Sequence, residues 1–290
     1  MRNRRIHIAL LTSLLLLGTA AEAGDPGGNE IGRTTEKELN VVISSSFGKV
    51  VVEKGEPQKI IVGEALDEES RALTMDYSIR NRVGFLDINL NPDKEPADHK
   101  NGSFHFGDLK NSKWLLRFTD AMPIAFDIEL GVAQGEFDLT GLQVKDFNLS
   151  CGASNVVVSF DELNTESMNE LNVQCGVGKF EGRHLGNANF KRFRFEGGVG
   201  TATLDFSGAI NSEVDVDVNV GMGLCTIIVP KEVGARVFYD ESLVSRLDVE
   251  KDIRAVDETS YVSDNFKSAS GRMNIRVETG FGSVKIRRPK

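Results

Sequence analysis

One repeated pattern constrains the fold of this chain more than any other feature. Three apolar residues at alternate positions are followed by Gly-x-Gly or a close variant, after which the alternation resumes. The first glycine recurs after 21, 24, 22, 23 and 59 residues. The copies lie at 126–133, 147–154, 171–178, 193–200, 216–223 and 275–282, with a degenerate copy at 41–48.

Alternation with a period of two indicates strands that have one apolar and one polar face. A unit of about 22 residues with two or three short strands and no helix cannot bury its apolar face alone, but stacked copies can. The sequence therefore predicts an all-β fold, a single-stranded parallel β-helix (β-solenoid) with rungs of about 22 residues. The usual handedness of parallel crossovers makes it right-handed.

The repeated glycines are predicted to lie where each rung bends. Glycine accepts positive φ there, and its missing side chain lets backbones stack closely. The predicted structural turn glycines are Gly131, Gly152, Gly176, Gly178, Gly198, Gly200, Gly221, Gly223, Gly280 and Gly282. They lack the third glycine and the following helix of a dinucleotide-binding fingerprint, so we predict no nucleotide cofactor.

The sequence predicts a cleaved secretory signal at the N-terminus, over residues 1–23. Arg2, Arg4 and Arg5 precede an apolar run, and Ala21 and Ala23 form an A-x-A cleavage site. The apolar run is shorter than the roughly 20 residues of a membrane-spanning helix. We therefore expect an exported protein, periplasmic or extracellular, with no integral membrane segment after cleavage.

Cleavage would remove three arginines and one glutamate, which changes the net charge from −9 to −11. An acidic protein is repelled by nucleic-acid phosphates and by anionic lipid head groups, so we predict no nucleic-acid partner. The basic C-terminal tail, 285–290, is interpreted as a solvated terminus rather than a membrane-binding patch.

The domain organisation follows from changes in composition and pattern. We predict a disordered linker at 24–37, a β-rich N-terminal region at 38–122 and the β-solenoid repeats at 123–290. The 59-residue gap implies an insertion or cap at about 234–271 that folds over the end of the stack. Within it, 241–247 could form a helical turn.

These segments also carry a family resemblance. The runs at 114–118, 123–133, 137–142 and 149–154 resemble the bacterial toast-rack proteins, and those at 198–208, 220–230 and 261–285 are similar to the LiaF-like C-terminal domains of the cell-wall-active antibiotic response. The resemblance implies an extracytoplasmic β-helical domain without an established catalytic role. Some relatives are adhesin-like, and the LiaF-like branch is tied to envelope-stress regulation, but this chain lacks that branch's transmembrane helices.

Two cysteines occupy equivalent positions in adjacent repeats. Cys151 and Cys175 each precede the first glycine, and the Cα atoms of adjacent parallel strands lie about 4.8 Å apart, within disulfide range. Because direct cross-strand geometry is often strained, we favour free buried thiols over a disulfide. Cys225 is expected to be free and buried, and three scattered cysteines do not make a zinc site.

No catalytic, metal or cofactor site is predicted. His99, His105 and His184 are interpreted as solvated loop or turn histidines. The outward carboxylates Glu136, Asp138, Glu181 and Asp205 are interpreted as a solvated outer face, because glycosidase chemistry needs two acids at a fixed separation in a cleft. Exposed Trp and Tyr, typical of sugar-binding faces, are scarce, with a lone tryptophan at Trp114.

The predicted function is a non-enzymatic, extracytoplasmic binding or scaffold protein of the bacterial cell envelope, adhesin-like or related to envelope stress. Its expected partner is an envelope protein or a cell-wall component, with possible self-association through the ends of the solenoid. The alternative is a polysaccharide-acting β-helical enzyme that uses the outward carboxylates. A groove with converging acids and a perturbed carboxyl would distinguish the alternative from a smooth, charge-mixed face.

Overall fold

The computed structural model describes residues 29–67, 73–90, 112–240 and 245–289. The predicted signal segment 1–23, the start of the linker, His99 and His105 lie outside these residues. Within them, sixteen strands form one sheet and a single 3₁₀ turn, η1 (Leu185–Ala188), interrupts the strands. The sheet is open, because its path runs from β1 to β14 without closing.

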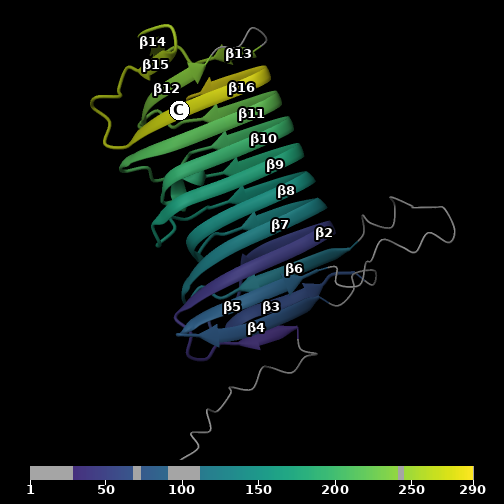
Figure 1. The fold of residues 1–290 in the computed structure, drawn as a ribbon. Coiled ribbons are helices and arrows are strands. Elements are labelled where there is room, and N and C mark those ends of the chain that lie inside the picture. The colour runs from purple at the N-terminus through teal and green to yellow at the C-terminus, as the bar shows by residue number, and fades with distance from the viewer. Residues whose placement is uncertain (1–28, 68–72, 91–111, 241–244, 290) are drawn as a thin grey trace, which may run out of the picture.

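Seven long strands form the body of the molecule (Figure 1). They are β2 (Glu38–Lys54), β7 (Pro123–Asp138), β8 (Gln143–Ser159), β9 (Met168–Arg183), β10 (Phe190–Asp205), β11 (Glu213–Ile228) and β16 (Arg272–Arg287). Neighbours pair in parallel in the order β2-β7-β8-β9-β10-β11-β16, so each copy of the pattern lies on the next. The degenerate copy at 41–48 is the copy in β2, paired with β7.

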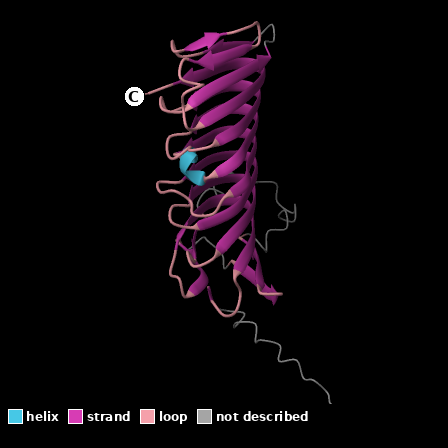
Figure 2. Cartoon of the chain, turned by 90° about the vertical axis from the view of Figure 1, so that its left-hand side faces the viewer, coloured by secondary structure: helices cyan, strands magenta, loops and turns pink. Residues whose placement is uncertain are grey.

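Each repeat is one strand of 16 or 17 residues, and the expectation of two or three short strands per repeat is wrong. The pairing continues through the Gly-x-Gly: Gly197 pairs with Cys175 before it, Val199 with Val177 within it, and Thr201 with Lys179 after it. Because every copy bends at the same place, neighbouring backbones stay parallel through the bend and the pairing resumes in the same register. The long strands alternate with loops that gather along one edge of the stack (Figure 2).

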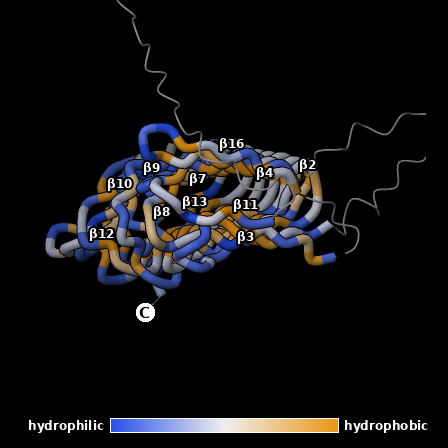
Figure 3. The backbone as a smooth tube through the Cα atoms, turned by 90° about the horizontal axis from the view of Figure 1, so that it is seen from below, coloured by the Kyte–Doolittle hydropathy of each residue, from blue (hydrophilic) through white to orange (hydrophobic). Residues whose placement is uncertain are grey.

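The buried side of each strand changes at the bend. In β9, Leu171 and Val173 are buried, Val177 is exposed, and Phe180 is buried again. Odd-numbered residues therefore face the core in the first half of β9 and even-numbered residues in its second half, and β7 and β11 change in the opposite order. Viewed from below, hydrophobic and hydrophilic residues alternate along the chain (Figure 3).

The apolar sides form one continuous core that is rich in phenylalanine. Phe118 and Phe126 meet edge to face, with ring centroids 5.2 Å apart. Phe126 and Phe147, in the neighbouring strands β7 and β8, also meet edge to face, with centroids 6.4 Å apart. Since such pairs add to the free energy gained from burial, the stacked aromatic residues hold neighbouring repeats together.

A buried asparagine, Asn164, connects neighbouring loops at the edge of the stack through hydrogen bonds. Asn164 is 3% exposed, and its side-chain amide donates to the carbonyl oxygens of Val144 at 2.7 Å and Ala188 at 3.1 Å. Its side-chain oxygen accepts from the Val144 N–H at 3.0 Å. One side chain thus satisfies backbone groups on both neighbouring levels, which offsets the cost of burying it.

The N-terminal end of the stack covers β2 with two short strands. β5 (Val83–Asn89) pairs with the first half of β2, and β6 (Lys113–Phe118) pairs with the second half. Antiparallel strands follow: β3 (Lys59–Ala65) on β6, β1 (Glu30–Gly32) on β3, and β4 (Thr74–Arg80) on β5.

The segment between β11 and β16 forms the other end. β12 (Gly234–Asp240) pairs with the first half of β16, and β13 (Ser245–Asp248) pairs with the second half. β15 (Ser260–Ser263) adds antiparallel to β12, and β14 (Ile253–Ala255) adds to β15. The expected helical turn is wrong at 245–247, because these residues pair along β16; residues 241–244 lie outside the described ranges.

The basic C-terminal tail is not a solvated terminus at Arg287 and Arg288. The Arg288 side chain is fully buried, its Nε lies 2.9 Å from Asp252 Oδ2, and its Nη2 donates to the Lys231 carbonyl oxygen at 2.8 Å. Arg287 pairs with Asp248. Both arginines therefore fix the inserted segment onto the end of β16.

The bend glycines bring neighbouring backbones into contact. Gly200 has φ of +150°, and a Cβ built there would lie 1.9 Å from the Gly178 carbonyl oxygen. Gly178, Gly223 and Gly282 repeat this geometry, with φ of +136° to +145° and a Cβ at 1.8–1.9 Å from the strand before. A side chain at this position would separate two strands of the stack.

We expect Gly200→Ala to lower the free energy of unfolding by roughly 3 kcal/mol, because it combines an unfavourable φ with a backbone clash. Gly152→Ala is the matched comparison: a Cβ there lies 3.0 Å from the Gly131 oxygen and needs no positive φ, so the loss should be smaller. Gly32, with nothing within 4 Å, serves as the neutral control. Denaturant unfolding measures all three, and equal losses for Gly200 and Gly152 would contradict this account.

Asp252→Ala should destabilise the C-terminal end by roughly 3 kcal/mol, since it leaves the buried Arg288 charge without its carboxylate. Asp264→Ala is the control, because its partner Arg254 is 72% exposed and such surface pairs contribute little. Hydrogen exchange of β12 and β14 amides reports the local loss. Similar protection in both variants would show that the buried pair does not hold the insertion.

Candidate functional site

An exposed apolar column runs along the outside of the bends. It consists of the residue between the two glycine positions in six consecutive strands: Val132, Ala153, Val177, Val199, Met222 and Phe281. We call it the bend column. All except the small Ala153 are large hydrophobic residues that are 48–55% exposed.

The bend itself puts these side chains outside. In these six strands the buried side changes between odd-numbered and even-numbered residues at the bend, and the side chain at the change points away from both halves. Val177 pairs with Val199, Val199 with Met222, and Met222 with Phe281, so the exposed side chains line up. With strands about 4.8 Å apart, six strands make a column roughly 25 Å long.

A hollow lies beside the column where Ala153 leaves a gap between two valines. It measures about 370 Å³ and is lined by Gly48, Lys49, Val132, Ala133, Gln134, Ala153, Ser154, Asn155, Val177 and Gly178. Its polar side is the aligned row Lys49, Gln134 and Asn155. The surface thus offers apolar side chains next to a cation and two amides.

The outer face of the first strand halves is polar and mixed in charge. Ion pairs join adjacent strands there, with Arg194 and Glu170 at 2.9 Å, Arg276 and Asp217 at 3.0 Å and Arg272 and Glu213 at 3.3 Å. Exposed pairs of this kind contribute little to stability. In contrast to this polar face, the bend column presents a row of apolar side chains on the outside of the stack.

The four outward carboxylates of the sequence analysis do not converge. Glu136 pairs with Lys49 at 2.6 Å, and Val157 of β8 separates it from Glu181 across the sheet. Asp138 accepts from the Thr140 N–H at 3.1 Å, and Asp205 accepts from the Ser207 N–H at 2.9 Å. The two aspartates therefore serve local turns.

Glu181 lies between two cations. Hydrogen bonds from Arg183 at 2.7 Å and Lys179 at 3.0 Å hold the pKa of this carboxyl below its ordinary value. A general acid needs the opposite change, a pKa raised toward the working pH.

His184 is partly exposed and lies beside a carboxylate. His184 has φ of +50° at the start of η1, is half exposed, and its Nδ1 lies 2.8 Å from Asp161 Oδ1. In the part of the chain that the structure describes, no three His, Cys, Asp or Glu side chains form a group that could hold a metal ion.

The cysteines lie just inside the bend. Cys151 and Cys175 pair across β8 and β9, with their Sγ atoms 2.7 Å apart, and both are thiols. The hydrogen bond between the two thiols lowers the pKa of Cys151 and raises that of Cys175. Cys225 is fully buried, and this burial raises the pKa of its thiol to about 12.

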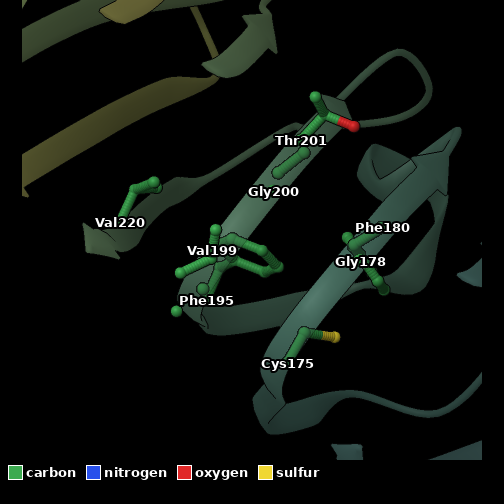
Figure 4. Close-up of a pocket in the computed structure, with 11 residues that line it drawn as sticks. Cys175, Gly178, Phe180, Phe195, Val199, Gly200, Thr201 and Val220 are labelled. Carbon is green, nitrogen blue, oxygen red and sulfur yellow. The ribbon is translucent and has the colours of Figure 1, made fainter. Parts of the chain in front are cut away.

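A small cavity of about 20 Å³ adjoins Cys175. The next residue in its row is Gly197, which has no side chain to fill the space. Figure 4 shows Cys175 among the lining residues, which come from β9, β10 and β11.

The bend column was not predicted from the sequence, although it consists of the middle residue of each Gly-x-Gly pattern. The available signal was its composition: Val, Ala, Val, Val, Met and Phe in successive repeats, where a solvated turn would carry polar residues.

Glu181 offers a direct test of the electrostatics of the outer face. Since its folded-state pKa is lowered, the pair stabilises the protein above the unfolded-state pKa, and this contribution is lost as the pH falls through the folded-state value. Arg183→Gln should raise the Glu181 pKa toward its ordinary value, measured by NMR titration of the carboxyl carbon. Lys231→Gln is a distant control, and an unchanged Glu181 pKa in Arg183→Gln would contradict the assignment.

No helix in the described ranges is long and apolar enough to cross a membrane. No curated protein matches the chain. Solved structures similar to this chain include a "putative cell adhesion protein" from Clostridium sporogenes ATCC 15579, with 19% identity and a TM-score of 0.42 over 91% of this chain and 96% of that one. They also include a "putative adhesin" from Bacteroides fragilis NCTC 9343, with 12% identity and a TM-score of 0.30 over 90% of this chain and 99% of that one.

The family model described as the N-terminal domain of toast_rack (DUF2154) matches residues 27–182 and again 162–228. The two matches overlap within the repeats, as expected where successive copies of one pattern fit the same model. Together they cover more than half of the chain, and the resemblance inferred from the sequence is confirmed: the chain belongs to the toast-rack family.

Proposed function

We propose that this chain is a non-enzymatic, extracytoplasmic binding or scaffold protein of the bacterial cell envelope, adhesin-like in action, whose partner docks along the bend column. The observation that carries the proposal is the exposure of an apolar residue at the same place in six consecutive strands. Contiguous apolar side chains rimmed by polar residues are typical of interaction surfaces. The export signal and the right-handed β-helix with rungs of about 22 residues are parts of this proposal.

The chemistry of the surface favours a protein partner. Sugar platforms stack on exposed tryptophan or tyrosine, whereas Trp114 is 1% exposed and the column is aliphatic apart from Phe281. Anionic lipid would be repelled by a chain of net charge −9. A protein segment with apolar side chains could lie along the column and use the amides of Gln134 and Asn155 at its edge.

The arrangement of the acids supports a non-enzymatic role over polysaccharide cleavage. Each of the four candidate carboxylates is engaged by a neighbouring cation or a backbone N–H. The one with a perturbed pKa, Glu181, is perturbed in the direction that keeps it ionised. An acid–base pair would instead require one carboxyl to hold its proton near neutral pH.

The test compares two double variants of the full chain. Val177→Lys with Val199→Lys places cations in the centre of the bend column; Asn148→Lys with Asn219→Lys adds the same charge to exposed positions of the outer face. Envelope extract supplies the partner, which is then purified, and its affinity for each protein is measured directly. We expect at least a tenfold loss for the column variant, about 1.4 kcal/mol or more, and little change for the control.

Equal affinity for both variants would remove the bend column as the docking surface. If the protein instead captures only glycan, and the glycan chains become shorter over time, the proposal of a non-enzymatic role is wrong. Glu136 and Glu181 would then be the first residues to substitute.

A further inference from the structure

We propose that Cys151 and Cys175 form a disulfide that joins β8 to β9 directly beneath the bend column when the protein meets a two-electron thiol oxidant. This inference is independent of the identity of the docking partner. It concerns a covalent modification site within the stack itself.

The register brings the two sulfurs together. Cys151 and Cys175 are direct partners in adjacent parallel strands, whose Cα atoms lie about 4.8 Å apart, inside the range that a disulfide spans. The Sγ atoms are 2.7 Å apart, so a small rotation about each Cα–Cβ bond brings them to bonding distance. The backbones of β8 and β9 are already held in place by the strand pairing on both sides of the two cysteines.

The surroundings of Cys151 and Cys175 favour a bond between the two sulfurs. The next residue in the row is Gly197, and the cavity of about 20 Å³ beside Cys175 gives its side chain room to rotate. That volume also accommodates one molecule the size of water. Cys175 is partly exposed, whereas Cys151 is buried, so a small oxidant reaches the pair from the Cys175 side.

The chemistry balances with hydrogen peroxide as the oxidant. Peroxide transfers one oxygen to the sulfur of Cys151, the thiol of the pair with the lowered pKa, which becomes a sulfenic acid, and one water leaves. The Cys175 sulfur then attacks the Cys151 sulfur, the S–S bond forms, the S–O bond breaks and a second water leaves. Two thiols and one peroxide thus give one disulfide and two waters.

Cys225 provides an internal control. It pairs with Ala202 on one side and Val284 on the other, so it has no thiol neighbour in its row. It is also fully buried, which protects it from the oxidant. A two-electron oxidation that consumed Cys225 would have to proceed by a different route.

The predicted result is site-specific. Purified full-length protein is treated with stoichiometric peroxide, denatured, alkylated with iodoacetamide and weighed by mass spectrometry. We expect the loss of two hydrogen atoms, a single alkylated residue at Cys225, and a linked peptide pair that contains Cys151 and Cys175. Oxidised protein should melt about 5 °C above reduced protein, because the bond closes a loop in the unfolded chain.

Two variants make the outcome decisive. Cys225→Ser should form the bond and show no alkylation after oxidation, whereas Cys175→Ala, at the partly exposed position, should keep two alkylated cysteines and show no thermal shift. Three alkylated cysteines in oxidised wild type, oxygen adducts on single cysteines, or covalent dimers would each overturn the proposal. None of these results depends on binding at the bend column, so the two proposals fail separately.

Discussion

The close contact of neighbouring backbones at the bend is the constraint on which the rest of this structure depends. At Gly178 and Gly200 the carbonyl oxygen of one strand occupies the space where a Cβ of the next would lie. A strand that slipped by one residue would place a side chain at that point and would also turn its apolar residues to the outside. The glycine positions and the alternation therefore specify the same register, and the long parallel pairing follows from both.

The same constraint produces the exposed column. Each of the six strands of the column changes its buried side where it bends, and the residue at the change belongs to neither half. In β9, β10, β11 and β16, glycines on both sides leave this residue without covering neighbours along its own strand. In a protein that used the bend only to turn the chain, polar residues would be the favoured choice here; instead Val177, Val199 and Met222 are about half exposed. Since that exposure costs free energy, a binding role gives a physical reason for it.

Much of the body could be predicted from the sequence because its information is local. The alternation in 147–151 and 171–175 marks the buried side, and the glycine spacing marks the bend, so the aligned repeats follow. What depends on distant partners could not be predicted. Arg288 looks like a solvated tail residue until the insertion brings Asp252 to it. Ser245–Asp248 becomes a strand because it meets β16, not because of its own pattern.

The two ends of the stack are covered in the same way, because at each end two short strands pair with the last long strand. At one end β5 and β6 each cover half of β2, and at the other β12 and β13 each cover half of β16. No end strand crosses the bend, so none needs the glycine pair. Short antiparallel strands then finish each edge: β1, β3 and β4 at one end, β14 and β15 at the other. A further bent repeat from another molecule would find no continuous bent strand to pair with, which disfavours growth of the stack end to end. The sides of the stack, and the bend column in particular, are therefore better suited to partners than its ends.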